Sequence, residues 1–538
     1  MALLELLLAL LISAVALGWV ARHFKFPYPI ALVADGMVLG LVPNLPTSTF
    51  DPQIILVAVL PPILYQAALL TSWADFKANI RPIGLLAIGL VAVTTLAVGA
   101  VLKWLVPDVP WAAAFALGAI VSPPDAVAAT AILSRLNMPR RIVTILEGES
   151  LVNDASGLVL YKFAVAAVLT GAFSWMDAAV QFTAVSAGGI VIGIVLAHAY
   201  IAVHKRLGDP FIETLTVLTI PYAAYIAAET VHVSGVLAVV AAGLVRGRYA
   251  PEIVSAEMRI MARSVWNLLV FLLNSLVFIL IGLQMHAVVA QNLVRYSPGQ
   301  LAGIAAAVTF TAVAVRFLWV FPVAYLPQRL SGNLRERRPH KGELAIIGWC
   351  GMRGIVSLAA ALALPLTLPG GAPFPHRELI VFITFVVIFA TLVGQGLTLT
   401  PLIRRLKVGS DWSLHDEQLR VRAAMSSAAL GAIEEMLAAE RVPPEWAQGL
   451  KAEVADRIAL AASEDEELTP RMEFVHRLHR AVIRAERQEL IRLWRGNEIG
   501  DEVMHHLMEL LDYEQAHLPA LPADAPQEPA TPPASSRA

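Results

Sequence analysis

One apolar stretch of the sequence contains the side chains most able to do chemistry: residues 147–154 are Glu-Gly-Glu-Ser-Leu-Val-Asn-Asp. A membrane-embedded aspartate costs roughly 2.5–3.5 kcal/mol on insertion scales, so it is usually retained because it binds or moves something charged. The oxygens of Asp154, Ser150 and Asn153 are hard donors that suit a small hard cation, and no histidine or cysteine stands beside Asp154 to favour zinc. A carboxylate that holds either a cation or a proton is the minimal site for exchange.

The composition places these residues in a polytopic membrane protein. Of the 538 residues, 57% are hydrophobic and only 15% are charged, with a mean hydropathy of +0.66, whereas soluble domains are about 25% charged. The net charge of −2 averages an apolar region and a charged tail, so it says nothing about partners. The single cysteine, Cys350, excludes an intrachain disulfide. Because no catalytic triad or metal-ligand set stands out, we predict neither an enzyme nor a cofactor, and nothing indicates nucleic-acid binding.

The apolar segments predict thirteen transmembrane helices, since a span needs about 20 apolar residues and broken helices can be shorter. Basic residues gather in alternate loops, while the other loops contain only Lys103, Arg295 and Arg377. The positive-inside rule then places the N-terminus outside and the C-terminal tail in the cytoplasm. The first segment is expected to be a retained helix, with a cleaved signal peptide as the alternative. The expected segments are 2–20, 28–43, 53–70, 82–106, 111–134, 142–170, 178–203, 211–229, 232–247, 264–290, 300–326, 342–367 and 378–403.

Two of these segments contain residues that break helices. Pro123 and Pro124 in the fifth segment remove backbone donors directly before Asp125. The twelfth segment has three glycines around a buried arginine, Arg353. Broken helices in corresponding halves indicate an inverted-repeat transporter whose site lies near the bilayer midplane.

Helix geometry predicts that the acids of segments five and six reach the same depth. Asp154 lies about 20 Å along a helix that enters from the cytoplasm, and Asp125 lies about as far along one that enters from outside. Ser150 shares the face of Asp154, and Glu147 lies roughly on that face, two turns nearer the cytoplasm. The two acids are therefore expected to converge on one site.

Other charged residues are assigned structural roles. Glu149 points about 140° away from Asp154, and we predict that it pairs with Arg353, because either charge would be costly alone. Lys162 is expected to snorkel to the outer face, with an ion pair as the alternative. Arg316 is expected to pair with a carboxylate or a helix end rather than to take part in transport.

The motifs together resemble those of sodium/proton antiporters of the monovalent cation:proton antiporter-1 family. Segment 148–154 is similar to the family's signature, and Arg353 lies in a stretch similar to its glycine-arginine motif. The resemblance covers residues 1–407, and the end of the tail is similar to tails of bacterial members. The motifs that carry it lie, in order, at 60–64, 122–129, 148–154, 274–278 and 351–357.

The resemblance implies an all-α fold of thirteen helices with inverted repeats, embedded in a bilayer as a homodimer. It implies a mobile core domain built from helices at 82–170 and 300–403. The dimerisation helices would lie at 1–70 and 178–247.

The resemblance also implies roles for individual residues. Asp154 would carry both cation and proton, while Ser150, Asp125 and the Pro124 carbonyl help to build the site. Asn153 occupies the place where electrogenic relatives have a second aspartate, which implies electroneutral exchange. The resemblance also implies a pair between Glu149 and Arg353. Gln66 stands at a position where many relatives have a carboxylate.

Residues 408–514 predict a helical cytoplasmic tail, with helices near 476–495 and 498–513. Residues 515–538 are rich in proline, alanine and serine and are expected to be disordered. The role of the tail stays open.

The leading hypothesis is Na⁺/H⁺ exchange in a bacterial inner membrane, serving pH homeostasis and sodium tolerance. A K⁺/H⁺ antiporter of the same fold is the nearest alternative, and the choice between Na⁺, K⁺ and Li⁺ stays open. A cation channel is disfavoured because no filter-like carbonyl motif is found and paired broken helices favour alternating access. A transporter-shaped cation or pH sensor is a further alternative.

Overall fold

The computed structural model is almost entirely helical in the residues that it describes. These are residues 12–13, 15–17, 23, 28–40, 52–133, 136, 138–171, 175–207, 209–254, 256–331, 340–369, 371–406, 408, 413–440, 444–449, 451–452, 454, 468–496, 498 and 501–517. Within these ranges the chain forms no named β-strand, and its one isolated bridge joins Thr367 and Pro373. The predicted all-α class is confirmed.

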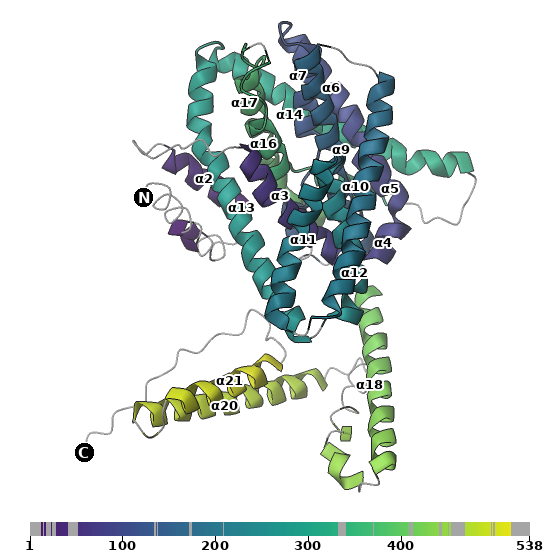
Figure 1. The fold of residues 1–538 in the computed structure, drawn as a ribbon, viewed down its shortest axis with the longest axis vertical. Coiled ribbons are helices and arrows are strands. Elements are labelled where there is room, and N and C mark those ends of the chain that lie inside the picture. The colour runs from purple at the N-terminus through teal and green to yellow at the C-terminus, as the bar shows by residue number, and fades with distance from the viewer. Residues whose placement is uncertain are drawn as a thin grey trace. The chain divides into compact units, whose positions relative to one another are not determined.

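The chain divides into two compact units, Met1–Asp411 and Trp412–Ala538 (Figure 1). The first contains α2 (Tyr28–Leu39), α3 (Pro52–Leu70), α4 (Trp73–Ala78), α5 (Ile80–Gly84), η1 (Leu85–Leu90), α6 (Val91–Leu105), α7 (Trp111–Val121), α8 (Ala126–Leu133), α9 (Arg140–Thr170), α10 (Trp175–His204), α11 (Pro210–Thr230), α12 (Gly235–Ile253), α13 (Ala256–Leu293), α14 (Pro298–Ser331), α15 (Lys341–Trp349), α16 (Ile355–Leu362) and α17 (Arg377–Leu406). The second contains α18 (Ser413–Glu440), η3 (Pro444–Ala447), α20 (Leu468–Arg495) and α21 (Asp501–His517).

Long apolar helices confirm a multi-pass membrane protein. Among the described residues, seven helices are long and apolar enough to cross a bilayer, and Val57–Leu70 and Trp111–Val121 are shorter apolar helices. The count of thirteen stays a prediction, because most of the expected first segment lies outside the described residues. The other expected segments agree with described helices to within a few residues at most of their ends.

The two segments predicted to break do so. The fifth is split into α7 and α8, with Ser122–Asp125 between them, and the twelfth into α15 and α16, with residues 350–354 between them. Proline causes the first break, because it lacks a backbone donor. The segment before α7 also departs from regular helix, since η1 is a π-helix between α5 and α6. Two of its backbone carbonyls accept hydrogen bonds from side chains: Ser156 donates to Ala87, and Trp319 donates to Leu85.

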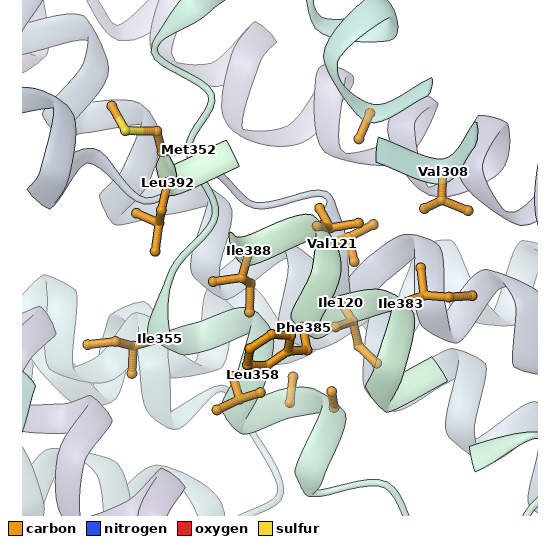
Figure 2. Close-up of a cluster of buried hydrophobic side chains, with 14 of the residues drawn as sticks. Ile120, Val121, Val308, Met352, Ile355, Leu358, Ile383, Phe385, Ile388 and Leu392 are labelled. Atoms are coloured by element: carbon orange, nitrogen blue, oxygen red, sulfur yellow. The ribbon is translucent and has the colours of Figure 1, made fainter. Parts of the chain in front are cut away.

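Two groups of buried apolar side chains form the packing of the first unit. The larger gathers residues of η1, α6–α9 and α13–α17 with a few of α2 and α3, and Figure 2 shows Ile120 and Val121 of α7 beside Phe385 and Ile388 of α17. The smaller gathers residues of α3 and α10–α12 with Leu151 and Ala155 of α9 and Met258 and Trp266 of α13. In Figure 1, α10 and α12 run side by side within this second group. The broken helices thus belong to the larger group.

The second unit has a helical hairpin near its end. Helices α20 and α21 pack side by side, and Arg487 of α20 lies 2.6 Å from Asp512 of α21. The two predicted tail helices are therefore present. Helix α21 continues through 515–517, the first three residues of the segment predicted to be disordered, and residues 518–538 lie outside the described part.

Candidate functional site

The site is built where the two broken segments meet. The backbone N–H of Asp125 donates to the carbonyl of Met352 at 2.6 Å, so the interruptions touch directly. Gly354, which precedes α16, packs against the side chain of Asp125 so closely that an added Cβ would overlap the Oδ2 atom. Asp125 thus lies at the start of both α8 and α16, where exposed N–H groups favour a negative charge.

Arg353 stabilises the crossing through backbone carbonyls. Its Nε donates to Val121 at the end of α7 at 3.0 Å, and a terminal nitrogen donates to Ala312 of α14 at 3.3 Å. The other terminal nitrogen donates to Gly351 in its own interruption. A helix ends with unpaired carbonyls and a partial negative charge, so a buried guanidinium here supplies both donors and charge.

Asp154 lies on α9 beside this crossing and is buried. The neighbouring Asn153 is fully buried, and its Nδ2 donates to the Pro124 carbonyl at 3.1 Å. The Oδ1 atom of Asn153 is buried without a hydrogen-bond partner in the described part of the protein. The amide therefore ties α9 to the first break and presents a spare oxygen beside Asp154.

Exposure increases along the face of α9 that carries Asp154. Asp154 is buried, Ser150 one turn away is half-buried, and Glu147 is exposed. The three residues therefore mark a polar line from the start of α9 towards the crossing. Segments five and six meet here through the hydrogen bond from Asn153 to the Pro124 carbonyl.

The predicted pair between Glu149 and Arg353 is wrong. Glu149 instead binds Arg316 of α14 in a two-pronged ion pair, with N–O distances of 2.5 and 2.7 Å. Both side chains are 1% exposed, and Arg316 Nε also donates to the Ile347 carbonyl near the end of α15 at 3.0 Å. The expectation for Arg316 is confirmed on both counts, because it meets a carboxylate and a helix end. Sequence spacing could not choose between two buried arginines.

Lys162 and Gln66 make contacts between helices. Lys162 does not simply snorkel, because its Nζ lies 2.8 and 3.0 Å from the carboxylate oxygens of Glu229 on α11. This is the alternative that the sequence left open. Gln66 of α3 donates to Asn267 of α13 at 3.4 Å, a long and weak bond.

The Lys162–Glu229 pair is expected to matter little for stability. Its side chains are 55% and 34% exposed, and exposed pairs contribute about 0.2–1 kcal/mol. Lys162→Ala should therefore lower the free energy of unfolding by less than about 1 kcal/mol. Thermal unfolding of the purified protein in detergent measures this, with Lys205→Ala, an exposed lysine, as the control. A loss as large as that of a buried pair would contradict the expectation.

Gly354→Ala is expected to disturb the crossing. The added carbon would lie 2.7 Å from Cβ of Asp125 and closer still to its carboxylate, so Asp125 or α16 must move, at a cost of about 1–3 kcal/mol. We expect cation-dependent proton flux to fall strongly while the protein still inserts in the membrane. Gly303→Ala on α14 is the matched control, because an added Cβ there meets nothing within 4 Å. Equal flux in both variants would show that the contact at Gly354 is not needed.

Sequence reasoning missed several polar residues at the crossing. Thr391 of α17 accepts the backbone N–H of Arg353 at 3.1 Å, and Thr398 accepts the indole N–H of Trp349 at 3.0 Å. Gln395 lies between them on α17 and is buried, and neither of its amide atoms has a partner in the described part. A lone amide in an apolar span was the available signal for Gln395; for threonine there was none, because it often bonds to its own helix.

Comparisons with known proteins agree with this architecture. The family model described as the transmembrane sodium/hydrogen exchanger matches residues 8–405. The chain belongs to the sodium/hydrogen exchanger family. Its members are transporters and not enzymes.

Relatives of this exchanger align with it over most of its length. An uncharacterized Na⁺/H⁺ exchanger of Mycobacterium tuberculosis is 33% identical over 531 residues, covering 96% of each chain. A sodium, potassium, lithium and rubidium/H⁺ antiporter of Bacillus pumilus is 36% identical over 414 residues, 74% of this chain and 61% of that one.

A solved structure of the sodium proton antiporter MjNhaP1 from Methanocaldococcus jannaschii resembles the exchanger in fold. The TM-score is 0.57 at 18% identity, and the match covers 77% of this chain and 98% of that one. The likeness confirms the antiporter fold.

Proposed function

We propose that this exchanger swaps Na⁺ for H⁺ by alternating access, with Asp154 binding the cation and the proton in turn. The observation that carries the proposal is the burial of Asp154 next to the crossing of two broken segments. A carboxylate in such a place is retained at an energetic cost, and broken helices beside it supply backbone carbonyls and amides for ligands. Ser150, Asp125 and the Pro124 carbonyl complete the proposed ligand set, and Glu147 stands on the approach.

The buried charges support one-for-one exchange. Glu149 is neutralised by Arg316, and Arg353 donates to backbone carbonyls. No lysine or arginine in the described part forms an ion pair with Asp154. Asn153 adds no charge, since it is a neutral amide held by Pro124. When Asp154 alone of the two site carboxylates exchanges one monovalent cation for one proton and Asp125 keeps its state, the site returns to the same net charge, which makes the cycle electroneutral.

Potassium is the second candidate cation. The Bacillus pumilus relative at 36% identity is named for sodium, potassium, lithium and rubidium. Hard oxygen ligands suit each of these ions, and selectivity depends on the size and rigidity of the site.

The moving parts follow from the packing. We propose that the helices within 82–170 and 300–403 form the mobile core, and that those within 1–70 and 178–247 form the dimerisation domain of a homodimer. Most residues of the smaller apolar cluster come from α3 and α10–α12, which supports this division, while Leu151 and Ala155 of α9 pack into the same cluster and join it to the proposed core. Gln66 would join α3 of the dimerisation domain to α13, through Asn267.

The proposed orientation has the N-terminus outside and the tail in the cytoplasm of a bacterial inner membrane. Two of the three basic residues in the opposite loops are bound to backbone. Lys103 donates to the carbonyls of Pro107 and Val109, and Arg377 donates to those of Leu362 and Leu364 at the end of α16. These two residues therefore have local structural roles, which supports the positive-inside assignment.

Proton flux in reconstituted vesicles tests the proposal. Purified full-length protein is placed in liposomes with an internal pH dye and an acid interior, and Na⁺, K⁺ or Li⁺ is added outside. We expect cation-triggered alkalinisation of the liposome interior, which protein-free liposomes should not show. When Na⁺ is the substrate, clamping the membrane voltage with K⁺ and valinomycin should leave this signal unchanged. No response to any cation would overturn exchange, and a response that follows voltage would overturn electroneutrality.

A further inference from the structure

A second group of buried polar side chains lies outside the crossing, between α10, α11 and α12. Tyr200 and His204 stand one turn apart at the end of α10, Glu213 lies in the first turn of α11, and Arg246 lies on α12. His204 is 1% exposed and Arg246 is 3% exposed. The proposed exchange mechanism uses none of these residues.

The four side chains touch one another in sequence. The Tyr200 hydroxyl lies 3.0 Å from Nδ1 of His204, and the opposite ring nitrogen, Nε2, lies 3.7 Å from Oε2 of Glu213. The guanidinium of Arg246 lies over the Tyr200 ring, 5.5 Å from its centroid. The imidazole is therefore held between a hydroxyl and a carboxylate, with a cation over the tyrosine ring.

Three atoms of this group lack hydrogen-bond partners within the described residues. They are Nε2 of His204, Oε2 of Glu213 and Nε of Arg246, and all three are buried. Buried polar atoms are nearly always satisfied, so such a concentration calls for an explanation. Two of the three face each other. A neutral imidazole with its proton on Nε2 can donate to Glu213 and accept from the Tyr200 hydroxyl, whereas a charged imidazole has two N–H donors and requires the Tyr200 hydroxyl to accept.

We propose that His204 is a second proton-binding site, separate from Asp154, whose protonation alters the packing of α10 against α11 and α12. With a neutral ring, Glu213 and Arg246 balance each other. With a charged ring the buried group has a net positive charge, which Arg246 opposes and which Glu213 and the Ile253 carbonyl favour. Burial adds to the opposition, because removing a cation from water is costly. Proton uptake therefore weakens this packing.

The surroundings of His204 include few other ionisable groups. Helix α10 packs against α11 and α12, which present Glu213 and Arg246. Lys205 and Arg206 follow His204 in the chain and are exposed. Further charged or titratable residues near this end are Tyr65 of α3, which is buried, and Arg248 and Glu252 of α12, together with Tyr249, which stacks edge-on with the exposed His198.

The first test measures stability and does not depend on transport. Thermal unfolding of the full-length protein in detergent is followed between about pH 8 and about pH 5.5, the range in which histidine titrates. We expect the wild-type midpoint to fall with acidification by roughly 2 °C or more beyond that of His204→Gln. His198→Gln is the matched control and should behave as wild type, since His198 is exposed on the same helix. Superimposable curves for wild type and His204→Gln would overturn the proposal.

A second variant decides the question if His204→Gln does not fold. Arg246→Gln removes the charge that opposes protonation, so the fall in midpoint on acidification should be smaller than in wild type. An unchanged fall would overturn the proposal.

Transport supplies an independent arm. The pH profile of cation-triggered flux should shift in His204→Gln, and an unchanged profile would count against a regulatory effect. Asp154→Asn should lose flux but keep the pH dependence of unfolding that His204 causes. Failure of the proposed exchange is therefore distinguishable from failure of the proton site.

Discussion

Asp154→Asn should abolish cation-dependent proton flux in proteoliposomes, with the protein still folded and inserted. Asparagine has nearly the same shape and keeps an oxygen at the site, but it cannot release a proton or supply a negative charge. The described arginines near the crossing bind Glu149 or backbone carbonyls, so the substitution leaves their contacts intact and the fold should survive. Flux should fall to the level of protein-free liposomes for Na⁺, K⁺ and Li⁺ alike.

A matched control separates the loss of a site carboxylate from the loss of any carboxylate. Asp75 of α4 forms a partly exposed pair with Arg140 at 2.5 Å, so Asp75→Asn should retain most of the flux. Folding is checked by thermal unfolding of both variants. Flux that survives in Asp154→Asn would mean that the exchange site lies elsewhere, with Asp125 as the next carboxylate to test.

Arg316→Ala should be the most destabilising single substitution among those considered. It leaves Glu149 charged and 1% exposed with its bidentate partner removed, and breaking such a buried pair costs about 3–5 kcal/mol. It also frees the Ile347 carbonyl near the end of α15. We expect a large fall in the midpoint of thermal unfolding and little protein in the membrane fraction.

A double-mutant cycle identifies the partner of Glu149. Glu149→Gln should rescue much of the damage from Arg316→Ala, because the uncompensated charge is gone. The same substitution should rescue Arg353→Ala far less, since Arg353 donates to the Val121 carbonyl rather than to the carboxylate. Stronger coupling of Glu149 to Arg353 than to Arg316 would contradict the structure.

The sequence by itself determined the membrane class, the helices and the places where two of them break. These features follow from local chemistry, because apolar length sets a span and proline removes a donor. The depth of Asp154 and Asp125 followed from helix rise and loop charge, and the contact between Asn153 and Pro124 agrees with that estimate. The two expected tail helices also followed from their periodicity.

Only the tertiary structure decided which charges meet. The sequence offered Glu149 two buried arginines, and the fold places Arg316 of α14, not Arg353, against it on α9. Lys162 had an acid on a helix more than sixty residues away, and His204, Glu213 and Arg246 gather from three helices. A side chain at a given position on a helix has a known direction but an unknown neighbour, because the neighbour depends on how whole helices cross. Ion pairs and buried polar clusters are therefore properties of packing, whereas spans and breaks are properties of the chain.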